Sequence, residues 1–327
     1  MTALLAVEEL EIGFGDLAAV RKASLTVHRG KTHCLVGESG CGKSVTALAI
    51  MGLLPRSATR RARGLRFDGR ELLALSEREM SRLRGDRMAM IFQEPMTSLN
   101  PAYTVGTQMA EVMQRHRGAT RAAALDRAAE LLARVRITSP GMRLGQYPHQ
   151  LSGGLRQRVM IAMALMCEPE LLIADEPTTA LDVTVQAQIL RLLLDLQKDF
   201  GLAILLITHD LGVVARMAHR VSVMYAGEVV ESAPAGSLFG RPTHPYTRGL
   251  LSCVPVPGKV RRGARLGSIA GVVPRTGIGF EGCGFRERCA QAIDSCRHAI
   301  APATAAADHA YLCRLSPDWS GAATPPA

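Results

Sequence analysis

The chain has 327 residues, of which 47% are hydrophobic, 21% charged and only 4% aromatic. This composition excludes intrinsic disorder, allows a substantial buried core, and favours helices and buried parallel strands over an all-β sandwich. The net charge of +10 indicates an anionic partner, namely a nucleotide, a nucleic acid or an anionic membrane face, unless it only reflects a basic proteome.

The first residues, "MTALLAVEEL", have neither a basic start nor a long apolar core, which argues against a secretory signal. The most apolar stretches, 159–166 and 202–207, are too short to span a bilayer. We therefore expect a cytosolic chain with reduced thiols. In such a chain, clustered cysteines indicate metal or redox chemistry rather than disulfides.

Along the chain, continuous apolar runs alternate with helical patterns. Residues 32–40, "THCLVGESG", predict a buried strand that ends in a glycine-rich turn, and a helix follows at 45–55. Further on, the sequence predicts a helix at 121–135, a strand at 169–177, a helix at 183–200 and a strand at 201–210. This alternation indicates an α/β fold with a parallel sheet.

Two segments differ in texture from this pattern. The arginine-rich piece 56–70 predicts an exposed strand and turn with a solvated charged face. Proline and glycine become frequent after about residue 235, which predicts a domain boundary near 240–255.

The segment "GESGCGKS" at 37–44 lies between a strand and a helix, where a P-loop is expected. Backbone N–H groups of such a turn bind phosphate oxygens, and glycines allow the close approach. Lys43 can reach the β- and γ-phosphates and Ser44 can ligate Mg²⁺, whereas Cys41 is expected to be a passive filler. The sequence predicts that a nucleoside triphosphate is bound by Gly37, Glu38, Ser39, Gly40, Cys41, Gly42, Lys43 and Ser44.

A second phosphate motif, "LSGGLRQR" at 151–158, separates this chain from P-loop kinases, GTPases and motors. A serine hydroxyl and backbone amides at a helix start can cap a γ-phosphate. Together with the P-loop, the motif resembles the signature of the ATP-binding-cassette (ABC) superfamily, over residues 5–250. The resemblance implies a head-to-tail pair of cassettes, in which ATP on the partner's P-loop is contacted by Ser152, Gly153, Gly154 and Gln157.

The same resemblance implies roles for six further residues. In "LLIADEP" (171–177), Asp175 resembles the residue that holds Mg²⁺, and Glu176 resembles the general base that polarises water. The other assignments are Gln93 as a contact to Mg²⁺ or water, Asp182 in the loop that crosses to the partner site, His209 as the γ-phosphate switch histidine, and Phe14 as the aromatic on adenine. A core aromatic is the alternative for Phe14. Catalysis by Lys43, Gln93, Glu176 and His209 would combine positioning with electrostatics.

Three further segments resemble the oligopeptide/dipeptide/nickel uptake family of ABC ATP-binding subunits: "EPMTSLNP" (94–101), "RPTHPYTRGLL" (241–251) and the cysteine-bearing tail. The resemblance implies a P-loop NTPase core with a parallel sheet, a small antiparallel β-subdomain, and a helical subdomain at about 96–155. It further implies an ATP-binding domain at 1–250 and an irregular cysteine-containing extension at 251–327.

The family also implies a function and partners. ATP hydrolysis would energise bacterial import of di- or oligopeptides or of a related solute, such as a nickel chelate or glutathione. The partners would be a second, paralogous cassette, two integral-membrane permease subunits and, indirectly, a solute-binding protein, at the cytoplasmic face of the inner membrane. Two alternatives stay open, an ATPase that acts on nucleic acid and a redox- or iron-responsive regulatory ATPase. No aromatic-interleaved basic surface supports the former, so no nucleic-acid partner is expected.

Four of the eight cysteines gather in the tail, as Cys283, Cys289, Cys296 and Cys313. Their intervals of five, six and sixteen residues differ from the close pairs of structural zinc sites, whereas iron–sulfur clusters accept looser loops. Negative charge on the sulfurs would be offset by Arg286, Arg288, Arg297 and Arg314. The family resemblance implies a [4Fe–4S] cluster, with zinc or free thiols as alternatives, in a structural or a regulatory role.

Overall fold

The computed structural model describes residues 2–93, 98–179, 181–254, 267–274, 277 and 280–316. The chain divides into two compact units. The first consists of Met1–Leu4, Val27–Lys31 and Gly69–Ile207, and the second of Leu5–Thr26, Thr32–Asp68 and Thr208–Ala327. The boundary expected near residue 250 separates an ATP-binding domain from a C-terminal extension. It does not correspond to the division into these two compact units, and it stays a prediction.

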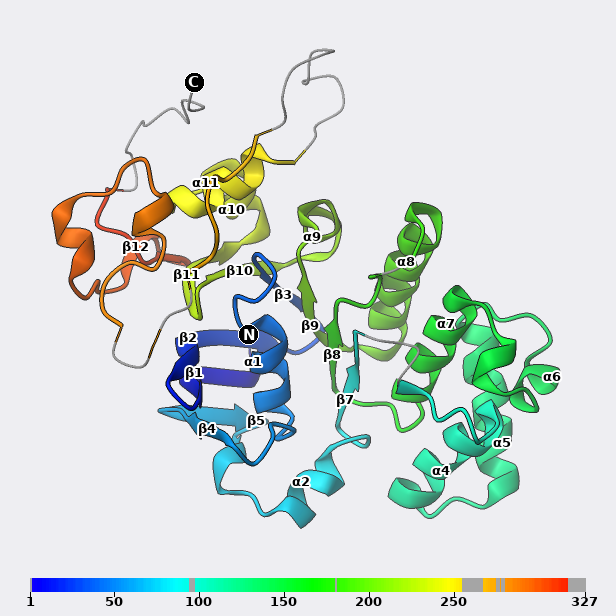
Figure 1. The fold of residues 1–327 in the computed structure, drawn as a ribbon. Helices are drawn as coiled ribbons and strands as arrows, with labels where there is room; N and C mark the ends of the chain where they lie inside the picture. The colour runs from blue at the N-terminus through cyan, green and yellow to red at the C-terminus, as the bar shows by residue number, and fades with distance from the viewer. Residues whose placement is uncertain are drawn as a thin grey trace. The chain divides into compact units, whose positions relative to one another are not determined.

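In the first unit, parallel strands lie in the order β7 (Met88–Ile91), β8 (Leu171–Asp175) and β9 (Ala203–Thr208) (Figure 1). Every residue of β8 and β9 is buried, as expected for apolar strands covered on both faces. The helix α8 (Val183–Phe200) connects these two strands, because parallel neighbours require a crossover connection. The predicted strands and helix are therefore present.

Helices dominate the rest of the first unit. They are α2 (Glu77–Leu83), α4 (Val105–Arg117), α5 (Arg121–Arg134), α6 (Pro140–Leu144) and α7 (Gly153–Ala164), with the short elements β6 (Arg70–Glu71), η1 (Leu72–Ala74) and η2 (Pro148–Gln150). Thr104 and Thr120 begin α4 and α5, because each hydroxyl accepts a hydrogen bond from a backbone N–H of the first turn, at 3.3 Å in both. The helices α4 to α7 belong to the helical subdomain that the family resemblance implied, whereas its bounds of about 96–155 stay a prediction. Residues 94–97 of the "EPMTSLNP" segment lie outside the described residues.

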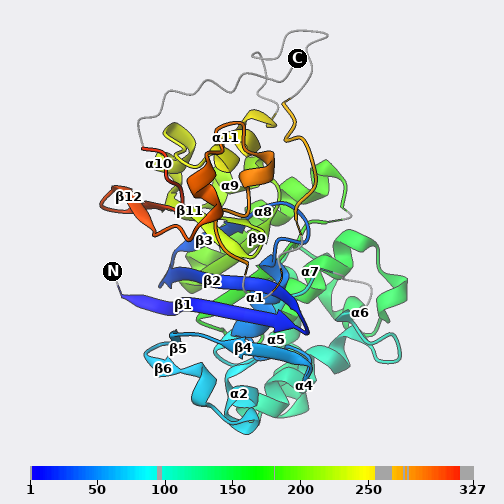
Figure 2. The ribbon, with the colours of Figure 1, turned by 60° about the vertical axis from the view of Figure 1, so that its left-hand side comes forward.

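The second unit contains a mixed sheet. Its strand order is β12 (Ala303–Ala306), β13 (His309–Tyr311), β11 (Glu228–Pro234), β10 (Arg220–Tyr225) and β3 (Thr32–Val36). The pair β10 and β3 is parallel, and the other neighbours are antiparallel. The tail was expected to be irregular, yet its described part contains the β12–β13 hairpin, which extends this sheet beside β11 (Figure 2). Buried side chains of His309 and Tyr311, two positions apart, fix which face of β13 turns inward.

An antiparallel sheet completes the second unit, with β1 (Ala3–Phe14), β2 (Leu17–His28), β4 (Ala58–Arg61) and β5 (Gly64–Phe67). The strand β1 pairs with both β4 and β5. The arginine-rich segment therefore forms strands as predicted, and it buries Leu65 and Phe67 while Arg66 stays exposed. This sheet is the antiparallel β-subdomain that the family resemblance implied.

The remaining elements of the second unit are short. They are α1 (Lys43–Ile50), α9 (Leu211–Met217), α10 (Ala235–Gly240), α11 (Pro245–Ser252), η3 (Arg286–Arg288) and η4 (Asp294–Arg297). In the tail, Phe285 is only 4% exposed, and its ring lies 5.2 Å from that of Tyr225 and 5.3 Å from that of Tyr246. This aromatic contact anchors the cysteine segment to β10 and α11. None of the helices in the described ranges combines the length and apolar character that a bilayer span requires.

Candidate functional site

The P-loop at 37–44 connects β3 to α1, and its backbone admits only glycine at two positions. Gly37 has φ +156°, and a Cβ there would lie 2.1 Å from the carbonyl oxygen of Met224. Gly42 precedes α1 with φ +107°, and its Cβ would lie 2.6 Å from the carbonyl oxygen of Ala19. Glycine is therefore required both by dihedral angle and by the close approach of neighbouring backbone.

Lys43 is the first residue of α1 and is 4% exposed. Its ammonium donates hydrogen bonds to the carbonyl oxygens of Gly37 at 2.9 Å and Glu38 at 3.0 Å, so the charge is held at the loop. The thiol of Cys41 is 1% exposed, and burial raises its pKa, which agrees with a passive filler. Ser39 and Gly40 are exposed. The loop thus has buried supports and an accessible rim.

In the first unit, two carboxylates follow one another at the end of β8. Asp175 is 4% exposed, and Glu176 has the left-handed φ of +45°, a strained conformation that is typical of functional sites. The carboxylate of Glu176 accepts hydrogen bonds from the hydroxyl of Thr179 at 2.9 Å and from the side-chain amide of Gln93 at 3.3 Å. The structure therefore brings together Gln93 and Glu176, two residues that were predicted to be catalytic.

The signature residues begin α7. The hydroxyl of Ser152 accepts a hydrogen bond from the backbone N–H of Leu155 at 3.4 Å and caps the helix, while Ser152 and Gly153 stay exposed. Gly154 is half-buried, and a Cβ there would lie 3.1 Å from a methyl group of Val185. Gln157 differs from the expectation, because it is 1% exposed and does not reach the surface that Ser152 and Gly153 share.

The loop that contains Asp182 lies beside the signature motif. A Cβ on Gly153 would be 3.8 Å from the side chain of Leu181. Asp182 is exposed, and its carboxylate caps α8 by accepting a hydrogen bond from the N–H of Val185 at 2.9 Å. Both predicted trans-acting motifs therefore belong to one exposed region of the first unit.

Two further predicted residues belong to the second unit. His209 is exposed directly after β9, and Asp210 then caps α9 by accepting a hydrogen bond from Gly212 N–H at 2.7 Å. Phe14 ends β1 opposite Ala58 of β4, and it is half-buried rather than part of the buried core. Their placement at the ends of strands leaves both side chains accessible.

The tail cysteines converge. Cys283, Cys289, Cys296 and Cys313 line one small pocket together with Phe285, Ile293 and Ile300. Burial raises the pKa of the Cys283 thiol to about 11, and the neighbouring cysteines add to this shift. Burial also raises the pKa of Cys289 and Cys313. Among the described residues, no three histidine, cysteine or acidic side chains lie close enough together to hold a metal ion.

Of the arginines that flank the cysteines, Arg286 and Arg314 line this pocket. The guanidinium of Arg288 instead binds the carboxylate of Glu38 in the P-loop. This contact joins two segments that sequence reasoning had treated separately.

A buried carboxylate was also missed. Glu231 of β11 is 0% exposed and accepts hydrogen bonds from the backbone N–H groups of Thr243 at 2.7 Å and His244 at 2.8 Å. It also lies 2.7 Å from Nε2 of His309. Thr243 and His244 belong to the segment 241–251, which was identified from the sequence as a family marker. The sequence did not predict that this segment binds a buried carboxylate.

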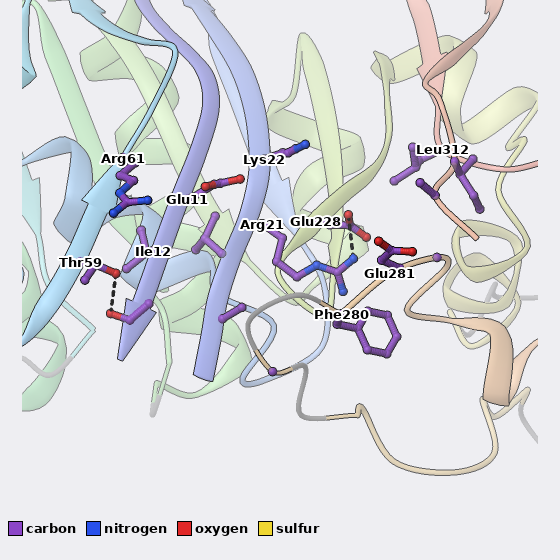
Figure 3. A pocket seen from close by; sticks show the side chains of 17 residues that line it. Glu11, Ile12, Arg21, Lys22, Thr59, Arg61, Glu228, Phe280, Glu281 and Leu312 are labelled. Atoms are coloured by element: carbon purple, nitrogen blue, oxygen red, sulfur yellow. Dashed lines mark hydrogen bonds and ion pairs between the residues drawn. The ribbon is translucent and has the colours of Figure 1, made fainter. Parts of the chain in front are cut away.

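A larger pocket of about 660 Å³ lies in the second unit between strands of the antiparallel sheet and the tail (Figure 3). Arg21 forms an ion pair of 2.9 Å with Glu228, and its guanidinium lies 4.6 Å from the ring centre of Phe280. None of the residues predicted to contact nucleotide lines this pocket. It is therefore separate from the P-loop.

Two protein-family models match this chain, one in the region of the P-loop and signature motif and one in the C-terminal region. The model of the family described as "ABC transporter" matches residues 20–179. The model described as "Oligopeptide/dipeptide transporter, C-terminal region" matches residues 230–296. The two matches together include the P-loop, the signature motif, and three of the four tail cysteines.

Curated relatives match almost the whole chain. It is 56% identical over 299 residues to the probable peptide ABC transporter ATP-binding protein y4tR of Sinorhizobium fredii, which covers 90% of this chain and 89% of that protein. It is 51% identical over 299 residues to the dipeptide transport ATP-binding protein DppD of Escherichia coli, with coverages of 90% and 91%.

Solved structures confirm the α/β fold class with its helical and antiparallel parts. The dimeric structure of MJ0796, a bacterial ABC transporter cassette, matches with a TM-score of 0.64 and 27% identity over 71% of this chain and 98% of that one. The structure of cbiO1 from Clostridium perfringens matches with a TM-score of 0.63 and 26% identity over 73% and 92%. The chain belongs to the oligopeptide/dipeptide family of ABC transporter ATP-binding subunits.

Proposed function

We propose that this chain is the subunit that hydrolyses ATP to drive a bacterial importer of di- or oligopeptides. The observation that carries the proposal is the carboxylate of Glu176, held by Gln93 and Thr179 at the end of β8, in a chain about half identical to peptide-transport ATP-binding proteins. A complete set of hydrolytic residues indicates an active ATPase rather than a degenerate cassette.

In this proposal, the residues act by positioning and electrostatics. The amides of 37–44 and Lys43 bind the ATP phosphates, and Ser44, Gln93 and Asp175 hold Mg²⁺, which neutralises phosphate charge when bound. Glu176 orients the attacking water, and His209 contacts the γ-phosphate. Phe14, accessible at the end of β1, stacks on adenine.

The exposed surfaces support the partners that the family resemblance implies. Ser152, Asp182 and the 82% exposed Val183 would face the ATP site of a second cassette, which we propose to be a paralogue. In the helical region, Tyr103 is 53% and Met142 is 59% exposed, and such apolar side chains suit contact with a permease. Two permease subunits and a solute-binding protein would complete the importer, with this chain bound at the cytoplasmic face of the inner membrane.

We further propose that Cys283, Cys289, Cys296 and Cys313 hold a [4Fe–4S] cluster. Four thiols that line one mostly apolar pocket fit the ligand set of such clusters, although the sulfurs must draw closer together on binding. Because burial raises the pKa of Cys283, Cys289 and Cys313, a bound cation is needed to keep these three as thiolates at neutral pH. The cluster would stabilise the packing of the extension, 251–327, against the ATP-binding domain, 1–250.

Anaerobic purification followed by an iron assay and an absorption spectrum near 400 nm tests the cluster. Cys289→Ser and Cys296→Ser should each lose iron, whereas Cys253→Ser, a half-buried cysteine outside the pocket, should keep it. Full iron content in both pocket variants contradicts the assignment, and zinc in place of iron supports the alternative metal.

Reconstitution tests the transport function. The chain should stimulate peptide uptake into vesicles that contain the permeases and a second cassette, and Glu176→Gln should abolish uptake while the complex still assembles. ATPase activity that is stimulated by DNA, without any association with permeases, would contradict the proposal.

A further inference from the structure

The tail and the P-loop are joined by one arginine. Arg288 lies in η3, and its side chain is 5% exposed. Its guanidinium donates hydrogen bonds to both carboxylate oxygens of Glu38, at 3.0 and 3.1 Å, and to the hydroxyl of Tyr225 at 3.2 Å. The remaining N–H groups donate to the backbone oxygens of Ala270 at 2.7 Å and Ile269 at 3.0 Å.

This arrangement requires an arginine. A guanidinium is planar and presents several N–H donors in a fixed fork, so it can bind a carboxylate, a hydroxyl and two carbonyl oxygens at once. A lysine ammonium is a point charge with three donors and cannot reach the same set. Charge-assisted bonds to a carboxylate are also stronger than neutral ones. The position of Arg288 is therefore well determined.

Glu38, in turn, is part of the phosphate-binding loop. Its backbone N–H donates to the hydroxyl of Tyr246 at 3.0 Å, and its carbonyl oxygen accepts from the ammonium of Lys43 at 3.0 Å. Groups outside the P-loop thus hold both the side chain and the backbone of Glu38. A shift of Glu38 would displace one of the two carbonyl partners of the Lys43 ammonium.

The charge of Glu38 adds a second consideration. A carboxylate in the loop that binds a triphosphate repels the phosphate charge unless a cation offsets it. Arg288 supplies that cation, and Phe285, packed against both Tyr225 and Tyr246, keeps the arginine segment in place.

We infer that Arg288 is a positioning residue for ATP binding: it fixes Glu38 and neutralises its charge, so that the P-loop is set for the phosphates. This inference rests on the proposal that residues 37–44 bind ATP. It goes beyond that proposal because it assigns a role in nucleotide binding to a residue of the cysteine tail.

The test measures dissociation constants of ATP, ADP and AMP for the purified full-length chain and its variants. Arg288→Met, which keeps the apolar stem but removes the guanidinium, should weaken ATP binding about tenfold. The effect should be smaller for ADP and smallest for AMP, because fewer phosphates face the uncompensated carboxylate. Adding Glu38→Gln to Arg288→Met should recover most of the affinity, a rescue that loss of local structure would not produce.

Controls separate the possible failures. Arg297→Met makes the same change at an exposed arginine of the tail, 68% exposed and paired with Asp294, and should leave ATP binding unchanged. Lys43→Ala tests the proposed phosphate site itself. If Lys43→Ala loses ATP and Arg288→Met does not, or if Glu38→Gln fails to rescue, the inference is wrong while the proposed site stands. If Lys43→Ala binds ATP normally, the proposed site fails first. Should Arg288→Met not fold, Arg288→Gln decides, because it also removes the positive charge and must therefore weaken ATP binding more than ADP binding.

Discussion

The buried carboxylate of Glu231 should be among the most important side chains for the stability of the second unit. It accepts the two backbone N–H groups at the start of α11, from Thr243 and His244, and contacts His309 of the tail hairpin. Because it is 0% exposed, the groups that bind it are shielded from bulk water. We therefore expect Glu231→Ala to destabilise the joint between β11, α11 and β13.

The magnitude follows from the groups that lose their partner. Each backbone N–H that is left buried without an acceptor costs about 1–3 kcal/mol. Two such groups make the loss about 4 kcal/mol, before any cavity is counted. Glu231→Gln keeps one acceptor oxygen but directs an NH₂ at the second N–H or at His309, so about half of that loss is expected.

Thermal and urea unfolding of the full chain measure the effect, with hydrogen exchange at 241–252 and 303–311 to locate it. Glu287→Ala is the matched control, because Glu287 is 70% exposed and forms an ion pair with the neighbouring Arg286 at 3.2 Å; its change should stay within about 0.5 kcal/mol. If Glu231→Ala unfolds at the same temperature as Glu287→Ala, or if protection at 241–252 is unchanged, the reasoning is refuted.

Three other changes test individual features. Gly37→Ala places a Cβ 2.1 Å from Met224 O and should weaken ATP binding at least about tenfold, whereas Gly236→Ala, where a Cβ meets nothing within 4 Å, should not. Glu176→Gln should lower the rate of phosphate release about 100-fold or more with ATP binding retained, and wild-type turnover would exclude Glu176 as the general base. Burial lowers the pKa of His244 from 6.5 to about 3, so the unfolded chain takes up a proton below pH 6.5 that the folded chain does not. Stability should therefore fall by about 2 kcal/mol between pH 7 and pH 5. His244→Asn can keep the helix cap and should lack that part of the pH dependence in urea titrations, and identical pH profiles would contradict this.

The motifs encoded in consecutive residues were the most predictable part of the molecule. A buried strand, a glycine turn and a helix follow one another at 32–50, so the phosphate loop could be located from the amino-acid sequence alone. The acids at the end of β8 were located for the same reason, and the fold class was confirmed by the solved cassettes. The roles of the individual site residues stay predictions, because the position of a side chain does not by itself establish what it does in hydrolysis.

Other features depend on contacts that no local pattern reveals. Arg288 and Glu38 are 250 positions apart in the sequence. From its neighbours alone, Arg288 was interpreted as a charge partner of the cysteines, and Glu38 as a residue of the P-loop. The tail hairpin was missed because β13 is only three residues long; it forms by pairing with β11, not by its own propensity. Gln157 was assigned to the partner's ATP from the signature motif, yet its side chain is buried. Membership of the motif does not specify which way a helical side chain points.

The family segment 241–251 and the cysteine tail together support the P-loop through direct contacts with Glu38. Tyr246 binds the backbone of Glu38 and Arg288 binds its carboxylate, while Glu231 fixes the start of α11 that carries Tyr246. Phe285 packs against Tyr246 and sits three residues before Arg288. A disturbance of the cysteine pocket therefore reaches the P-loop by a short series of direct contacts. For that reason, changes at the pocket should alter the affinity for ATP before they unfold the chain.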